Sequence, residues 1–132
     1  MGHPTVHAVA NPDKPAVIMA GSGEIITYGA LDARSNQCAH LFRALGLQHG
    51  DTVAFCLENC AEFFDLVWGA QRAGLIYVAI SCRLTPSEMD YILNDSGAVA
   101  LPAVITARNT SMCRWVMRWA SAVSVMGKAY PY

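Results

Sequence analysis

The stretch AGLIYVAISCRLTPSEMDYIL, from Ala73 to Leu93, decides the fold. Gly74 is placed to end a preceding helix, and the apolar run that follows predicts a buried strand over Ile76–Ile80. The sequence Thr85-Pro86-Ser87-Glu88 then predicts a helix start, because Thr and Glu three residues apart can form a capping box and Pro suits the first helical position. A strand that passes through a loop into a capped helix is a building unit of α/β folds.

The residues before this unit show the same pattern. Thr52–Leu57 is a continuous apolar run, which is typical of a parallel strand covered on both faces. A helix is predicted over residues 60–73, and Asn59 and Glu62 predict a second capping box at its start. Apolar side chains cover most of the circumference of this helix, which indicates burial on more than one side.

Nearer the N-terminus, the sequence predicts a hairpin and a helix. Ala16–Ala20 and Glu24–Thr27 are short β-type runs on either side of a Gly-Ser-Gly turn. Thr27 can cap the helix that follows, and Gly46 is placed to end it. The helical spacing predicts an apolar face made of Leu31, Ser35, Cys38, Leu41, Phe42 and Leu45.

A third strand of the sheet is predicted over Val99–Thr106, at an edge or distorted, because Pro102 cannot donate to a central ladder. The expected fold class is therefore α/β, with an N-terminal hairpin and helix followed by a β-α-β-α-β unit in a doubly wound, mostly parallel sheet. Residues 1–15 are expected to form an N-terminal arm, residues 16–106 the folded part, and residues 107–132 a divergent tail.

The tail leaves several interpretations open. Trp115, Trp119 and Val123 share one helical face, with Arg114 and Arg118 beside it. Such a pattern fits an amphipathic helix that binds a membrane or a partner. It equally fits a short helix that covers the core, or a poorly ordered tail.

Composition narrows the class of protein. Charged residues make up 14% of the chain, below the usual quarter, so part of the surface is expected to be covered by other protein. The net charge of −1, without a Lys/Arg cluster, gives no electrostatic footprint for nucleic acid. Five cysteines at scattered positions argue against a disulfide framework and favour a reducing cytosol. With no signal region and no transmembrane-length apolar run, the interpretation is a soluble, cytoplasmic protein.

Candidate catalytic side chains are few. Ser81, Cys82, His40 and His49 are the available nucleophiles and bases, but nothing in their spacing brings them together. Cys82 is the thiol singled out, because it directly follows a strand at the carboxyl edge where α/β sites gather. The spacing of the cysteines and histidines indicates no metal site.

The residue types that bind phosphate or move protons are also missing from the expected places. Neither predicted parallel strand is followed by the glycines that would let backbone amides approach a phosphate. Glu62 and Glu88 are assigned to helix caps, and Asp65 lies in a mostly apolar helix, where an interdomain contact explains it as well as acid–base chemistry does. No catalytic, cofactor-binding or metal-binding residue is therefore predicted.

Taken in order, several stretches resemble the N-terminal part of the adenylate-forming superfamily, fatty-acid–CoA ligases in particular. The matching features are NPDKPAVI, a T-Y helix start, A-L-G-L followed by G-D-x-V-A, N-x-x-E-F, A-G-x-x-Y-V, R-L-T-P-x-E and D-S-G-A. Together they run from about Asn11 to Ala98. In this family T-Y-x-E-L is usual, whereas here Ala30 removes the carboxylate and Gly29 weakens the first turn.

The resemblance implies enzymes that bind ATP with magnesium, form an acyl-adenylate from a fatty acid and transfer the acyl group to coenzyme A. The phosphate loop, the adenine and ribose contacts and the catalytic lysine of that family lie downstream of the matched region. None of its catalytic residues falls on this chain. The expected function is a truncated fatty-acid–CoA ligase, inactive alone and holding no cofactor of its own. After Ala98 the resemblance fades, as expected of a frameshift, a truncation or a partial gene product.

Two other functions stay open. An exposed apolar surface of the lobe can pair with a partner polypeptide or with a second copy of the chain. The chain can also be a complete small α/β enzyme that uses Cys82 or His49.

Overall fold

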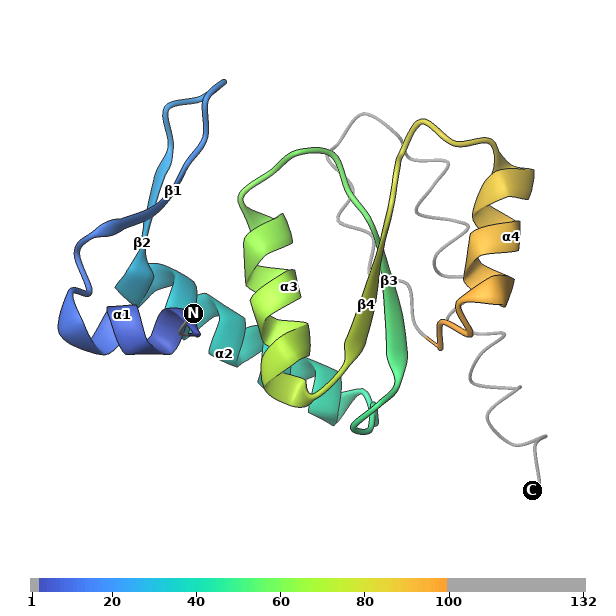
Figure 1. The fold of residues 1–132 in the computed structure, drawn as a ribbon, viewed down its shortest axis with the longest axis horizontal. Coiled ribbons are helices and arrows are strands. Elements are labelled where there is room, and N and C mark those ends of the chain that lie inside the picture. The colour runs from blue at the N-terminus through green and yellow to red at the C-terminus, as the bar shows by residue number, and fades with distance from the viewer. Residues whose placement is uncertain (1–2, 100–132) are drawn as a thin grey trace. The chain divides into compact units, whose positions relative to one another are not determined.

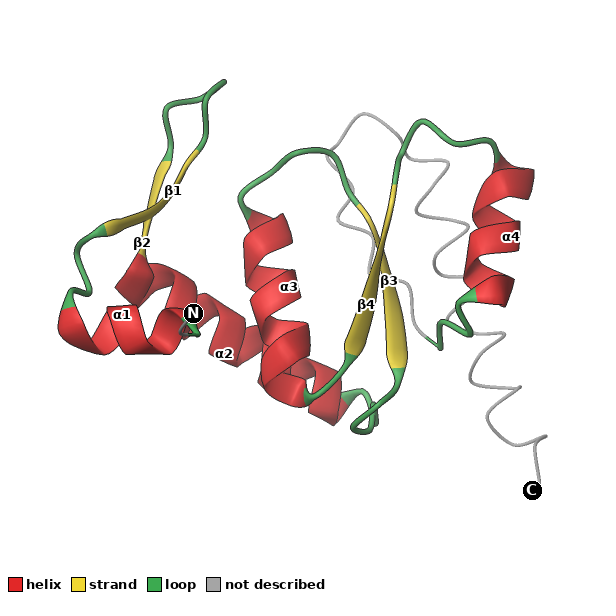
Figure 2. Ribbon diagram, in the orientation of Figure 1, coloured by secondary structure: helices red, strands yellow, loops and turns green. Residues whose placement is uncertain are grey.

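A computed structural model describes residues 3–99, which form two compact units. Within these residues, unit 1 comprises residues 3–50 and 59–75, and unit 2 comprises residues 51–58 and 76–99. The elements are α1 (Pro4–Ala10), β1 (Pro15–Ile18), β2 (Ile25–Thr27), α2 (Tyr28–Ala44), β3 (Thr52–Cys56), α3 (Glu62–Ala73), β4 (Ile76–Ile80) and α4 (Pro86–Asp95) (Figures 1 and 2).

The predicted hairpin of unit 1 is confirmed. β1 and β2 pair antiparallel, with Pro15 opposite Thr27 and Ile18 opposite Ile25. Gly23 in the turn has φ 74°, a left-handed conformation that glycine adopts without strain. Ile26 of β2 is fully buried, in a cluster with Leu31 and Ala61.

The helix predicted after Thr27 is α2, and its predicted cap is present. The Thr27 hydroxyl accepts a hydrogen bond from the amide of Ala30 at 3.2 Å. The apolar face was predicted partly wrongly, because Leu41 and Leu45 are 54% and 66% exposed. Leu45 lies beyond the last helical turn, and Leu41 lies beside the buried stripe instead of on it. That stripe consists of Leu31, Ser35, Ala39 and Phe42.

The first residues form a helix that the sequence pattern does not predict. In α1, Pro4 is buried and occupies the first turn, and the His3 side chain accepts a hydrogen bond from the Thr5 amide at 3.3 Å. α1 packs against α2. Its seven residues make barely two turns, too few for a periodic apolar signal, so its stability comes from this packing.

α3 packs against α2 at close range. Gly69 permits this approach, since a Cβ added there would collide with the Cβ of Cys38. The capping box predicted from Asn59 and Glu62 is wrong, because α3 begins at Glu62 without a side-chain cap. Ala61 already has helical dihedral angles, and its carbonyl accepts from the amide of Phe64 at 3.2 Å.

Unit 2 is built on a parallel pair of strands, as predicted. β3 and β4 pair in register from Thr52 with Ile76 to Cys56 with Ile80. Cys56, Ile80 and the Leu93 side chain of α4 belong to one apolar cluster. On the opposite face of the strands, the rings of Phe55 and Tyr77 stack with centroids 6.0 Å apart.

The expectation of a buried second strand holds only for its last residue. Ile76 and Tyr77 are 57% and 38% exposed, and only Ile80 of β4 is fully buried. Within the described residues β4 has β3 as its sole strand neighbour, so one of its edges faces no strand.

The described chain ends beside β3, where the amide of Val99 donates to the carbonyl of Thr52 at 2.9 Å. The helices together with the parallel pair β3 and β4 confirm the α/β class. Apart from Val99, the predicted strand Val99–Thr106 lies outside the described residues, as does the tail 107–132. The third strand and the doubly wound sheet therefore stay predictions.

Candidate functional site

The carboxyl ends of β3 and β4 bring two thiols together. Cys56 is the last residue of β3, opposite Ile80, and Cys82 follows Ile80 by two positions. Side chains alternate along a strand, so Cys82 emerges on the same side as Cys56. Their Sγ atoms lie 3.6 Å apart, and both are free thiols. The sequence pattern singled out Cys82 at this edge but gave no sign of its partner.

The Cys56 thiol is in an apolar setting. Cys56 is 2% exposed and lies in an apolar cluster with Ala54 and Leu93. Burial raises the pKa of Cys56 to about 12, and the hydrogen bond and charge of Cys82 act in the same direction. Cys56 therefore stays protonated at neutral pH, whereas Cys82 is the more accessible of the two.

The other proposed nucleophiles and bases are not brought to this pair. Ser81 is tied into the turn, where its hydroxyl accepts from the amide of Arg83 at 3.2 Å. His40 lies exposed on α2 and His49 lies exposed in the loop after it, both in unit 1. The His49 ring fills the space beside Gly74, where any added Cβ would meet it. The described residues thus contain no triad built on Cys82.

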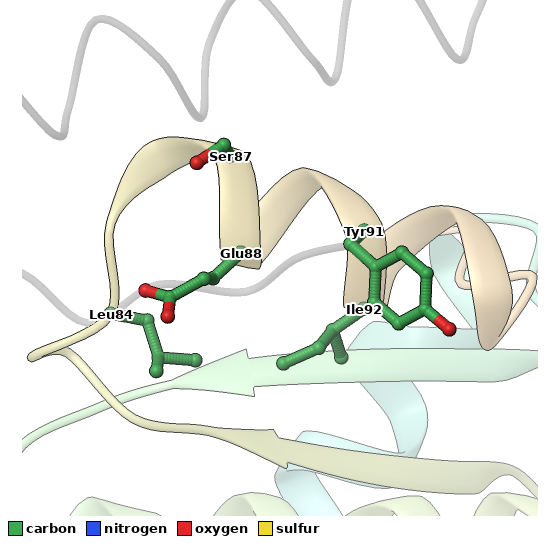
Figure 3. A pocket seen from close by; sticks show the side chains of 5 residues that line it. All are labelled: Leu84, Ser87, Glu88, Tyr91 and Ile92. Carbon is green, nitrogen blue, oxygen red and sulfur yellow. The ribbon is translucent and has the colours of Figure 1, made fainter.

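An open hollow of about 370 Å³ lies along α4. Figure 3 shows its lining side chains, which are Leu84, Ser87, Glu88, Tyr91 and Ile92. Its one carboxylate is already engaged, because Glu88 accepts from the Thr85 amide at 2.8 Å and hydroxyl at 2.7 Å. These bonds lower the pKa of Glu88. The predicted capping box is therefore confirmed, and the one carboxylate that lines the hollow serves this cap.

The charge of the described part of unit 2 does not suit a polyphosphate. Among its described residues Arg83 is the one cation, and it stands against five carboxylates. The five are Asp51, Glu58, Glu88, Asp90 and Asp95. A bound triphosphate needs the opposite balance, with several cations or amides aimed at it.

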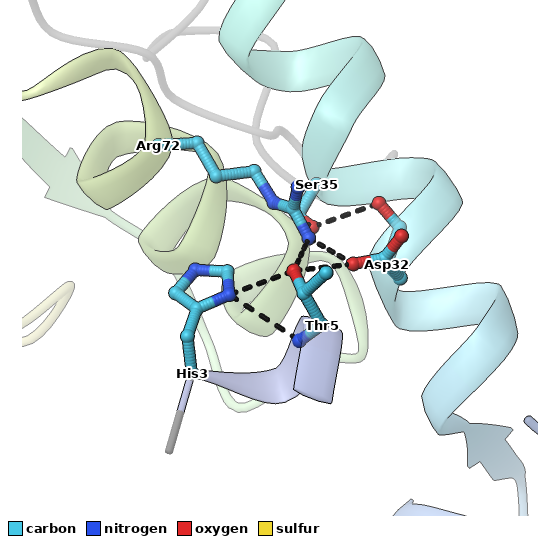
Figure 4. A network of polar contacts seen from close by, with 5 residues as sticks. All are labelled: His3, Thr5, Asp32, Ser35 and Arg72. Atoms are coloured by element: carbon cyan, nitrogen blue, oxygen red, sulfur yellow. Dashed lines mark hydrogen bonds and ion pairs between the residues drawn. The ribbon is translucent and has the colours of Figure 1, made fainter. Parts of the chain in front are cut away.

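A polar network in unit 1 joins three helices (Figure 4). Arg72 of α3 donates through Nε to the Ser35 hydroxyl at 3.1 Å and through Nη2 to Thr5 at 2.6 Å. The same Nη2 forms an ion pair with Asp32 of α2, which also accepts from the Thr5 hydroxyl at 2.7 Å. Sequence reasoning missed this network, because its partners lie up to 67 positions apart and share no local pattern.

The network lowers the pKa values of two side chains, Asp32 and His3. Partial burial alone would raise the pKa of Asp32, but hydrogen bonds from Thr5 and Arg72 outweigh it and hold the pKa below its ordinary value. Burial and the Arg72 charge lower the pKa of His3, against a smaller opposing effect of Asp32. The His3 ring also packs edge-on against Trp68 at 5.2 Å. The side chains of His3, Asp32 and Arg72 therefore stabilise the packing of the helices against one another.

Asp65 is the buried carboxylate of α3. It is 6% exposed, and its Oδ1 has no hydrogen-bond partner among the described residues. Its Oδ2 lies 3.7 Å from Arg34 of α2. Burial raises the pKa of Asp65, while Arg34 lowers it and Glu62 and Glu24 raise it further.

Neither a metal site nor a membrane-spanning helix is found in residues 3–99. Within residues 3–99, no group of three or more His, Cys, Asp or Glu side chains is placed to hold a metal ion. In the same part of the chain, no helix has the length and apolar character needed to span a bilayer.

Comparison with known proteins identifies the family. Residues 5–121 match the AMP-binding enzyme family. The chain belongs to the AMP-binding enzymes. A fatty acid–[acyl-carrier-protein] ligase, ScoC of Streptomyces coeruleorubidus, is 36% identical over 69% of this chain and 17% of its own length. A long-chain-fatty-acid–CoA ligase of Yersinia pestis is 38% identical over 78% of this chain and 18% of its own length.

A solved structure of a related protein has a similar fold. The N-terminal domain of FACL13 from Mycobacterium tuberculosis superposes with a TM-score of 0.74 at 28% identity, over 98% of this chain and 30% of that structure. The resemblance expected from the sequence is confirmed at the level of the family. The expectation that it fades after Ala98 is wrong at this level, because the family match extends to residue 121. The chain spans less than a fifth of the length of these two ligases.

Proposed function

We propose that residues 11–98 are a scaffold lobe of a fatty-acid–CoA ligase, and that the 132 residues alone do not form an acyl-adenylate. The observation that carries this proposal is the charge of unit 2, where Arg83 is the one cation among the described residues. Adenylation transfers a nucleotidyl group with loss of pyrophosphate, and the charge that develops must be met by positioned cations or amides.

Two arginines of unit 1, Arg34 and Arg72, are already engaged and do not supply the missing charge. Arg72 is held by Asp32, Ser35 and Thr5, and Arg34 lies beside the buried Asp65. Binding of a phosphate by either guanidinium would break these contacts. In an AMP-binding enzyme, ATP and magnesium would then be held by segments other than these 97 described residues, with this lobe as their support.

An ATP–pyrophosphate exchange assay with a long-chain fatty acid and magnesium tests the proposal. Circular dichroism first establishes that the purified chain is folded. We expect no exchange above a blank without protein, while a full-length long-chain-fatty-acid–CoA ligase in the same assay gives a strong signal. Robust exchange by the pure chain would overturn the scaffold proposal.

A second function, association through an apolar surface, is favoured by a different observation. Both units expose large apolar side chains, among them Leu45 at 66%, Ile76 at 57% and Tyr91 at 69%. Such surfaces commonly mark contacts with another polypeptide or with a second copy. Light scattering over a dilution series separates the two proposals, since a mass that rises with concentration supports association and a constant monomer mass argues against it.

A further inference from the structure

The Cys56 and Cys82 thiols lie in contact at the carboxyl edge of the two strands of unit 2. Their Sγ atoms are 3.6 Å apart, and a disulfide needs about 2.0 Å, so closure requires an approach of roughly 1.6 Å. Cys56 is fixed at the end of β3 by its pairing with β4. Cys82 lies in a turn between β4 and α4, outside any ladder, so the movement can come from its side.

The two thiols differ in access. Cys56 is 2% exposed, whereas Cys82 is half-buried. An oxidant in solution therefore meets Cys82 first. The Cys56 sulfur is then in position to attack the oxidised product, because it already contacts Cys82 through a hydrogen bond.

We propose that Cys56 and Cys82 are a redox site that closes to an intramolecular disulfide on exposure to hydrogen peroxide. In the first step the Cys82 thiol and peroxide give a sulfenic acid and water, with the sulfur oxidised and the O–O bond reduced. In the second step the Cys56 sulfur attacks the Cys82 sulfur. The S–S bond forms, the S–O bond breaks, and hydroxide leaves with the Cys56 proton as a second water.

The disulfide would join the end of β3 to the turn between β4 and α4, since Cys56 and Cys82 are 26 positions apart in sequence. Within unit 2 the bond would tie Cys56 to the turn that leads into the capping box of Thr85. Reduction by a dithiol would open it again. The proposal concerns these thiols alone and does not depend on whether the chain activates a fatty acid.

Peptide mapping of the whole chain tests the site without any substitution. The protein is treated with hydrogen peroxide, alkylated without reduction, digested and analysed by mass spectrometry. We expect the free thiols to fall from the five of the sequence to three, with Cys56 and Cys82 in one cross-linked peptide that dithiothreitol separates. Sulfinic acid on Cys82 beside an unmodified Cys56, or a cross-link to another cysteine, would overturn the proposal.

Two triple variants give a matched comparison. Cys38→Ser/Cys60→Ser/Cys113→Ser leaves Cys56 and Cys82 as the sole thiols, and it is expected to lose both to a monomeric disulfide. Cys38→Ser/Cys82→Ser/Cys113→Ser leaves Cys56 and Cys60, which are close in sequence, and it is expected to keep both. Equal loss of thiols in the two variants would mean that proximity in the fold does not select the pair.

Discussion

Asp65 is the residue whose environment most opposes its charge. Its side chain is almost fully buried, one oxygen has no partner among the described residues, and the nearest cation is the part-exposed Arg34. Because burial raises the pKa of Asp65, the unfolded chain releases this proton at a lower pH than the folded chain does. The charged carboxylate therefore reduces stability once the pH exceeds its unfolded pKa of about 3.9.

Replacing this carboxylate by a neutral amide is expected to stabilise unit 1. We predict that Asp65→Asn raises the free energy of unfolding at pH 7 by about 1 kcal/mol, since the lost ion pair with Arg34 is weak and part-exposed. Urea denaturation followed by circular dichroism measures the change. Asp13→Asn, at an exposed carboxylate between α1 and β1 in the same unit, serves as control and is expected to have little effect. A destabilised Asp65→Asn protein would show that the carboxylate makes a needed contact.

In contrast to Asp65, Arg72 has an ion pair and hydrogen bonds that stabilise its charge. It donates to Ser35 and Thr5 and pairs with Asp32, so it links α3 to α1 and α2. We predict that Arg72→Gln lowers the free energy of unfolding by about 2 kcal/mol, in the range of hydrogen bonds to charged groups. Arg43→Gln is the matched control, because exposed Arg43 donates only to the carbonyl of Arg72. Equal losses in the two variants would contradict a special role for the network.

The same network predicts an acid dependence. The pKa of Asp32 is lower in the folded protein than in the unfolded chain, so its stabilising effect is complete above the unfolded value of about 3.9. This effect is lost as the pH falls through the lower, folded pKa. The stability difference between the wild-type chain and Asp32→Asn should therefore be constant near neutrality and shrink below about pH 4. Urea midpoints measured from pH 7 to pH 3 give this difference, and a gap that widened in acid would refute the assignment.

At the scale of elements, α4 shows how local chemistry starts a helix. The Thr85 hydroxyl accepts from the Glu88 amide, and the Glu88 carboxylate accepts from the Thr85 amide. We predict that Thr85→Ala costs about 1 kcal/mol of stability, whereas Thr85→Ser keeps the hydroxyl and costs little. Thermal unfolding of the two variants makes the comparison. A Thr85→Ser protein as unstable as Thr85→Ala would mean that the methyl group, and not the cap, matters.

Elements that carry their own local signal were predictable, and those that depend on distant packing were not. The caps at Thr27 and Thr85, the hairpin and the parallel strands follow from residue types within a few positions. α1 and the exposure of Leu41 follow from contacts between helices, which periodicity does not contain.

The candidate thiol site was half predictable for the same reason. Cys82 was marked by its place after a strand, because the carboxyl edge of a parallel sheet is where such sites gather. Its partner Cys56 is fixed by the register that sets Cys56 opposite Ile80, and register is a property of two strands together. The Arg72 network likewise joins residues that no short window of sequence contains.

The whole molecule exposes apolar surface that its low charge does little to offset. Only 14% of its residues are charged, while the Ile76 and Tyr77 side chains of β4 are exposed. One edge of β4 also has no strand neighbour in the described part of the chain. Open strand edges of this kind pair with other strands, and a lysine on the edge is the usual protection against it.

We therefore predict that the chain self-associates and that Ile76→Lys weakens this association about tenfold, equivalent to about 1.4 kcal/mol. The added charge would have to lose water in an edge-to-edge contact, whereas the stem of the lysine can still cover the apolar surface in the monomer. Sedimentation equilibrium over a concentration series measures the dissociation constant. Val9→Lys is the control, because Val9 is 82% exposed and belongs to helix α1, not to a strand. A wild-type chain that stays monomeric at all concentrations, or a Val9→Lys protein that dissociates as readily as Ile76→Lys, would locate the effect elsewhere than at the edge of β4.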